Sequence, residues 1–146
     1  MAKTIIGRLE EIGLPELGIS QLTARVDSGA QTSSLHVDNI KKVKISGKPA
    51  IEFDLHPEFY DIDNIIHCQA LVHDIRQVKS SNGTSEQRFV IQTKAVLGEH
   101  SWPIEITLTN RSDMTYLMLI GRQALGEQFY IDPSRAFIAS NNENSR

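Results

Sequence analysis

The chain has 146 residues, of which 40% are hydrophobic and 23% are charged, and its formal net charge is −3. The length predicts a single domain over residues 1–146, with a core over about residues 4–139 and a polar tail over 140–146. Without an excess of positive charge a nucleic-acid binder is disfavoured, and no apolar run is long enough to span a membrane. A single cysteine, Cys68, excludes an internal disulfide, and the first residues lack a signal-peptide pattern, so we expect a cytoplasmic protein.

Short β-branched segments bounded by Gly, Pro, Asn and Asp recur along the chain, and helical periodicity is nearly absent. We expect strands over residues 4–11, 19–26, 32–37, 42–45, 50–55, 65–78 (one strand or two), 88–96, 102–109, 116–120, 129–131 and 136–138. Asn82-Gly83 is the strongest hairpin signal, and a second hairpin is expected over 132–135. Residues 121–127 form the only expected helix. The pattern predicts a mainly β fold, a closed or nearly closed barrel with one short helix near the C-terminus.

The segment from Val26 to Ala30 carries an Asp-Ser-Gly tripeptide at the point where an apolar strand is expected to end. Gly29 allows a sharp turn, and the Ser28 hydroxyl can hold the loop by bonding to backbone, so Asp27 would point into a cleft. Two carboxylates a few ångströms apart share one proton, so that one activates water while the other protonates the substrate carbonyl. Taken alone, the tripeptide is better explained as an ordinary turn.

A second segment changes this interpretation. The apolar strand expected over 116–120 ends in Gly121-Arg122 and enters a helical turn. Together the two segments resemble the retropepsin fold of retroviral aspartic proteases, in which a later apolar-Gly-Arg segment passes beneath an Asp-Thr/Ser-Gly-Ala loop. The hairpin over 80–84 lies where that fold has its flap. The stretches over 26–36 and 80–88 resemble more closely a bacterial and archaeal retropepsin-like group often labelled ATP-dependent zinc proteases. The likeness covers about residues 5–138.

The resemblance implies an aspartic peptidase that hydrolyses a peptide or protein substrate. Because the chain has one Asp-Ser-Gly motif and one Gly-Arg motif, a homodimer would pair the Asp27 carboxylates of two subunits. The residues implied to support the catalytic loop are Ser28, Gly29, Ala30, Gly121 and Arg122. The residues implied to bind substrate or form the flap are Arg76, Ser80, Ser81, Asn82, Gly83 and Arg88, with the two arginines placed to steer an acidic peptide.

One position departs from the retroviral pattern. Gln31 stands where those enzymes have an aspartate that pairs with the Gly-Arg arginine, so Arg122 lacks its expected anion. This leaves open a second function, a non-catalytic peptide-binding module that is the partner of an ATP-grasp amino-acid ligase.

No phosphate-binding loop and no His-Glu-x-x-His motif occur in the sequence. His67 and His73 would share a strand face, but six residues of strand separate them by roughly 20 Å, too far for one ion. We therefore expect no cofactor and no metal. A site built from His36, His56 or His100 with distant partners, as in a metal-assisted hydrolase, stays open as a third possibility.

Overall fold

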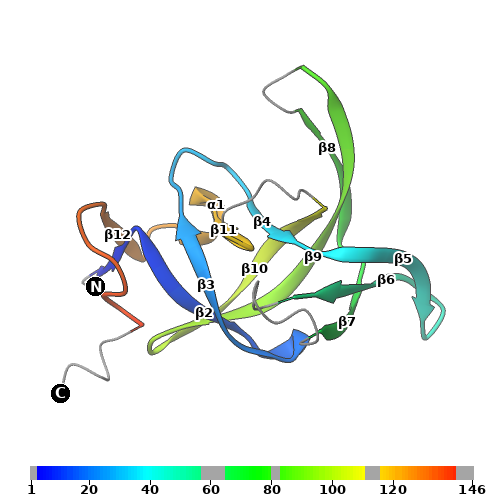
Figure 1. The fold of residues 1–146 in the computed structure, drawn as a ribbon, viewed down its shortest axis with the longest axis horizontal. Coiled ribbons are helices and arrows are strands. Elements are labelled where there is room, and N and C mark those ends of the chain that lie inside the picture. Colours follow the sequence, from blue (N-terminus) through cyan, green and yellow to red (C-terminus); the bar gives the residue numbers. More distant parts are fainter. Residues whose placement is uncertain (1–2, 57–64, 80–82, 111–115, 141–146) are drawn as a thin grey trace.

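The structure is a computed structural model that describes residues 3–56, 65–79, 83–110 and 116–140 (Figure 1). Its elements are β1 (Thr4–Gly7), β2 (Leu9–Leu14), the 3-10 helix η1 (Pro15–Leu17), β3 (Ile19–Val26), β4 (Ser33–His36), β5 (Asp38–Ile45), β6 (Lys48–Leu55), β7 (Ile66–Leu71), β8 (Asp74–Lys79), β9 (Ser85–Leu97), β10 (His100–Thr109), β11 (Met118–Ile120), α1 (Arg122–Leu125) and β12 (Phe129–Asp132). The expected mainly β fold with one short α-helix is confirmed. Within the described residues, no helix is long and apolar enough to cross a membrane.

Strands β10, β4, β11, β3, β2 and β9 follow one another in one sheet, and the sheet closes into a barrel because β9 also pairs with β10. Its interior is filled by inward-facing aliphatic side chains such as Ile12, Leu35 and Ile106, which are fully buried. The seam between β2 and β9 is short, with a single register pair between Gly13 and Val96. In the parallel pairing of β11 with β3, Ile120 lies beside Val26. The ends of these two strands therefore meet at one edge of the barrel.

Two further pieces extend from the barrel. Strand β8 pairs with the first half of β9, Asp74 with Val90 through Lys79 with Ser85, and this hairpin projects from the barrel (Figure 1). Strands β5, β6 and β7 form a separate antiparallel sheet beside the barrel. The segment expected over 65–78 is thus two strands that belong to two different sheets.

The C-terminal part of the chain differs from the expectation. Strand β12 pairs in parallel with β1, and the strand expected over 136–138 is absent, so residues 132–135 do not join a hairpin. Phe137 has a φ of +57° and donates its backbone N–H to the carbonyl oxygen of Leu9, at 2.8 Å. This segment leaves extended geometry because its backbone donors are satisfied elsewhere.

Glu10 provides the acceptors for the next three residues, 138–140. Its side chain is fully buried on β2, and one carboxylate oxygen accepts hydrogen bonds from the backbone N–H groups of Gly7 (2.7 Å), Ile138 (3.0 Å) and Ala139 (3.3 Å). The other oxygen accepts from the N–H (3.0 Å) and the hydroxyl (2.8 Å) of Ser140. A buried carboxylate is tolerated only when it is well hydrogen-bonded, and here it fastens residues 138–140 to the barrel.

Candidate active site

Asp27 follows the last residue of β3, and its loop is fixed by short backbone hydrogen bonds. The N–H of Asp27 donates to the carbonyl of Ile120 at 2.9 Å, and the N–H of Ala30 donates to the carbonyl of Asp27 at 3.2 Å. One carboxylate oxygen of Asp27 accepts from the N–H of Gly29 at 2.9 Å. Among the described residues, no group donates to the other oxygen. The half-buried carboxylate is therefore oriented through one oxygen and leaves the second open to a reactant.

Gly121 packs directly against the backbone of the Asp27 loop. A Cβ at this position would stand 2.6 Å from the carbonyl carbon of Thr32 and 2.9 Å from the carbonyl oxygen of Ala30, so a larger residue cannot occupy it without displacing backbone. The N–H of Gly121 donates to the buried hydroxyl of Ser33 at 3.1 Å. The next N–H, that of Arg122, donates to the carbonyl of Ala30 at 2.8 Å. The close approach that glycine permits thus ties the start of α1 to the Asp27 loop.

The Arg122 side chain contacts the loop as well. Its guanidinium donates to the carbonyl oxygens of Gly29 at 3.3 Å and Ser28 at 3.5 Å. The exposed Gln31 accepts from the N–H of Gln123 through its backbone carbonyl, at 3.1 Å. Backbone carbonyls therefore stand in for the missing aspartate as the acceptors of Arg122. The structure brings together Asp27 and all five residues expected to support it.

The two arginines expected to bind substrate lie on the projecting hairpin. Arg76 and Arg88 are opposite one another in the register of β8 and β9. Arg76 donates to Glu105 at 2.8 Å and to Asp74 at 2.9 Å, whereas Arg88 donates to Glu86 at 2.5 Å. Both guanidinium groups are thus already paired with carboxylates in this conformation.

Glu105 anchors the base of this hairpin to β10. The hydrogen bond from Arg76 favours the ionised form of Glu105, as does a contact with His73 at 3.1 Å, whereas burial opposes it. The net effect lowers the pKa of the Glu105 carboxyl. Gly83 is exposed with a φ of +90°, which suits a hairpin tip. The expected flap residues Ser80, Ser81 and Asn82 lie outside the described residues, so the roles proposed for the tip stay predictions.

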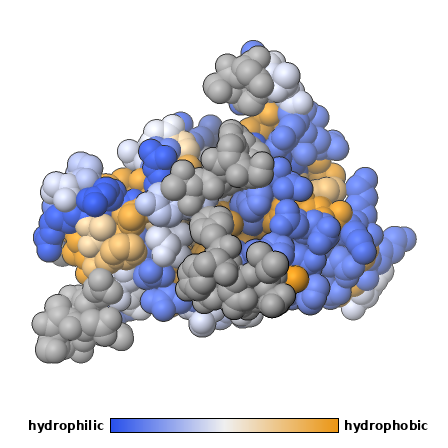
Figure 2. All heavy atoms as spheres, viewed as in Figure 1, coloured by the Kyte–Doolittle hydropathy of each residue, from blue (hydrophilic) through white to orange (hydrophobic). Residues whose placement is uncertain are grey.

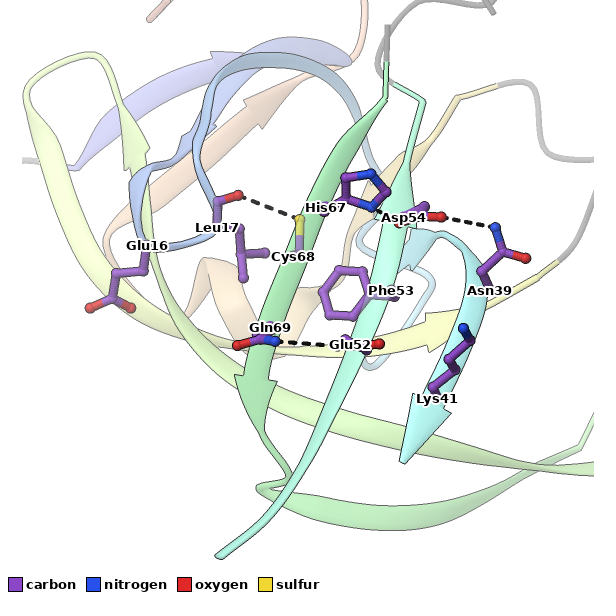
Figure 3. A pocket seen from close by; sticks show the side chains of 10 residues that line it. All are labelled: Glu16, Leu17, Asn39, Lys41, Glu52, Phe53, Asp54, His67, Cys68 and Gln69. Atoms are coloured by element: carbon purple, nitrogen blue, oxygen red, sulfur yellow. Dashed lines mark hydrogen bonds and ion pairs between the residues drawn. The ribbon is translucent and has the colours of Figure 1, made fainter. Parts of the chain in front are cut away.

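A hollow of about 820 Å³ lies over the sheet of β5, β6 and β7, beside η1 (Figure 3). Asp54 accepts from the side-chain amide of Asn39 at 2.8 Å and bonds to the ring of His67, and the amide contact is the first cause that lowers the pKa of Asp54. Cys68, on the opposite face of β7, is buried and donates to the carbonyl of Leu17 at 3.4 Å. Burial raises the pKa of this thiol to about 11.

The sequence reasoning missed this hollow, although alternating polar residues on β6 and β7 are a signal of a polar sheet face. Within the part of the chain that the structure describes, no three His, Cys, Asp or Glu side chains are grouped to hold a metal ion. His67 lies on β7, and His73 lies in the turn after it, so they do not share a strand.

The closed barrel, the Asp-Ser-Gly loop at the end of β3 and the Gly-Arg segment beneath it define a retropepsin-like protein. A family model described as "RimB-like: Retropepsin-like aspartic endopeptidase RimB" matches residues 5–142, and the chain belongs to this family. A crystal structure of a protein of unknown function (DUF785) from Legionella pneumophila superposes with a TM-score of 0.77 at 25% identity, covering 94% of this chain and 99% of that one.

Curated relatives carry a different name. A protein from Shewanella halifaxensis called "Probable alpha-L-glutamate ligase" is 47% identical over 92% of this chain. A protein of the same name from Desulfotalea psychrophila is 46% identical over 92% of the chain. The chain covers only 30% and 29% of these two relatives, less than a third of their length.

Proposed function

We propose that this chain is a peptide-binding module that works with an alpha-L-glutamate ligase. One observation carries the proposal: proteins named as such ligases contain, within one polypeptide, a portion that is 45–47% identical to at least 90% of this chain. Covalent linkage keeps two modules at a high effective concentration, which helps when both act on one peptide. The peptide held by the module would be the acceptor or product of the ligase.

A fused ligase offers a direct test of this proposal. The Shewanella halifaxensis protein would be prepared without its matching portion, and this chain would be titrated into it by calorimetry. We expect saturable binding and a lower KM for the peptide acceptor when the chain is added, because the module supplies acceptor affinity. An unrelated β-barrel of similar size serves as the control. No binding together with an unchanged KM would contradict the proposal.

The Asp27 loop supports a second candidate function, cleavage of a glutamate-bearing peptide. Each Asp27 is oriented by Gly29 through one oxygen and has its second oxygen open, so two copies facing each other across a twofold axis would hold a water between them. One carboxylate would take a proton from the water, whose oxygen attacks the peptide carbonyl, while the other protonates the carbonyl oxygen. Collapse of the resulting tetrahedral species, with proton transfer to the nitrogen, breaks the C–N bond and releases an acid and an amine.

Asp27→Asn separates the two candidates. Asparagine retains the size of the side chain and an acceptor for Gly29, but it cannot take a proton from water. We expect the variant to fold at least as stably as the wild type and to bind a glutamylated peptide, but to have lost cleavage measured by mass spectrometry. The control is Glu99→Gln, which removes an exposed carboxylate in the turn between β9 and β10. Cleavage by the Asp27 variant, or by a chain that sediments only as a monomer, would rule out the paired-carboxylate mechanism.

A further inference from the structure

A groove runs along the side of the molecule away from Asp27. Next to the hollow over β5–β7 lies a second one of about 380 Å³, and the two share Glu16, Leu17 and Gln69 in their lining. A third hollow, of about 440 Å³, continues toward Trp102 and shares Glu16 with both. Glu16, which lines all three hollows, lies on η1 before β3, whereas Asp27 follows β3. Eight residues of strand separate the two by roughly 25 Å, so the groove is distinct from the candidate active site.

The groove is bordered by strand edges. Strand β7 is an edge strand of its sheet as far as the described residues show, and it faces η1 and β9 across the second hollow. In an antiparallel edge strand every second residue turns its N–H and C=O away from the sheet, ready to pair with another strand. On the facing side, β8 pairs with β9 only as far as Val90, and β2 pairs only at Val96. Between these points β10 pairs with one edge of β9, and the described part of the chain places no strand against the other edge.

The floor of the hollow over β5–β7 is polar and ordered. Two cross-strand rows lie on one face of the sheet: Lys41, Glu52 and Gln69 in register, and two residues along, Asp54 beside His67 with Asn39 bonded to Asp54 (Figure 3). Figure 2 shows a largely hydrophilic surface over this end of the molecule. Most sheet faces that are this polar are simply solvated, but this one is concave and open at an unpaired edge.

Three carboxylates, those of Glu16, Glu52 and Asp54, line the groove against two ammonium groups, those of Lys41 and Lys94. Glu52 accepts from the amide of Gln69 at 3.2 Å, and Glu16 accepts from the Thr93 hydroxyl at 3.1 Å and the Lys94 N–H at 3.0 Å. Neither carboxylate has an ion-pair partner among the described residues. A ligand that carries positive side chains would complement them. Leu71, with 47% of its surface exposed at the end of β7, adds an apolar contact beside the edge.

We propose that this groove binds an extended peptide segment rich in lysine or arginine, which pairs with the free edge of β7 as an added strand. The main-chain hydrogen bonds supply affinity irrespective of sequence, and the side chains on alternate residues meet Glu52 and Glu16. An acidic segment is disfavoured by the same carboxylates. The groove should therefore prefer basic peptides, whereas a site for glutamate-bearing peptides would prefer acidic ones.

Fluorescence polarisation with two labelled peptides of equal length tests this assignment on the full chain. One peptide alternates lysine with threonine, and the other alternates glutamate with threonine. We expect saturable binding of the lysine peptide alone. The double variant Glu52→Gln/Glu16→Gln should weaken it by about 3- to 20-fold. The matched control Glu99→Gln/Glu127→Gln removes two exposed carboxylates outside the groove and should leave the affinity within about twofold, since it alters only the net charge.

Amide chemical shifts locate the bound peptide. The lysine peptide should shift the amides of residues 66–71 and leave those of residues 27–30 unchanged. Equal affinity for both peptides, equal loss in both double variants, or shifts confined to the Asp27 loop would each overturn the proposal. These outcomes do not depend on the ligase or on cleavage, so the groove and the proposed function fail separately.

Discussion

Gly121→Ala should displace the Asp27 loop and lower the stability of the protein. The added methyl group would stand 2.6 Å from the Thr32 carbonyl carbon and 2.7 Å from its oxygen, and these are backbone atoms that cannot rotate away. Overpacking of this kind costs about 1–3 kcal/mol. If the strands separate to relieve it, the Arg122 to Ala30 bond is strained or lost, at about 0.5–1.5 kcal/mol. We expect the free energy of unfolding to fall by about 2–4 kcal/mol.

Urea unfolding gives the stability change, and amide chemical shifts of residues 27–31 report the displacement of the loop. Ser28→Ala is the control, because it alters an exposed side chain of the same loop and should change stability by less than about 0.5 kcal/mol. A Gly121→Ala protein with wild-type stability and an undisturbed loop would refute the claim that close backbone contact positions Asp27.

Three further predictions concern groups outside the loop. Glu10→Ala leaves several buried N–H donors without an acceptor and should lower the free energy of unfolding, measured in urea, by about 3–5 kcal/mol. The control Glu11→Ala, on the same strand, should lower it by less than about 1.5 kcal/mol. Equal losses in the two variants would contradict the anchoring role of Glu10. Cys68 is buried and its pKa is raised to about 11, so at neutral pH it should react with a thiol reagent far more slowly than in the unfolded chain; equal rates would show that the thiol is open to solvent. Because the folded pKa of Glu105 is lowered, its ionised form adds stability above its unfolded pKa of about 4.3, and this is lost as the pH falls through the folded value. Arg76→Gln should therefore flatten the acid side of the stability profile, and an unchanged profile would exclude the pair as its source.

The sequence predicts those parts of the fold that depend on local pattern. Strand β3 and its Asp-Ser-Gly loop are recognisable because alternation of apolar residues stops where turn-forming residues begin, and Gly121 follows an apolar run in the same way. Their meeting in space is implied by a family resemblance rather than by the residues themselves.

Long-range effects explain the rest. The apolar residues over 136–138 predict a strand, but the N–H of Phe137 donates to the carbonyl of Leu9 and that of Ile138 donates to Glu10, a partner 128 residues away. Nothing near Glu10 in the sequence marks it as buried. The groove is hidden for a similar reason, because η1, β7 and β9 are far apart in the sequence and lie side by side only when the β5–β7 sheet packs beside the barrel.

The most direct test of the central claim is the calorimetric titration of this chain into the fused Shewanella halifaxensis ligase from which the matching portion has been removed. We predict saturable binding that is competed by the removed portion itself, because the two are similar over nearly the whole chain. Heat that does not saturate, or binding that the removed portion cannot compete, would contradict a role as the peptide-binding module of an alpha-L-glutamate ligase.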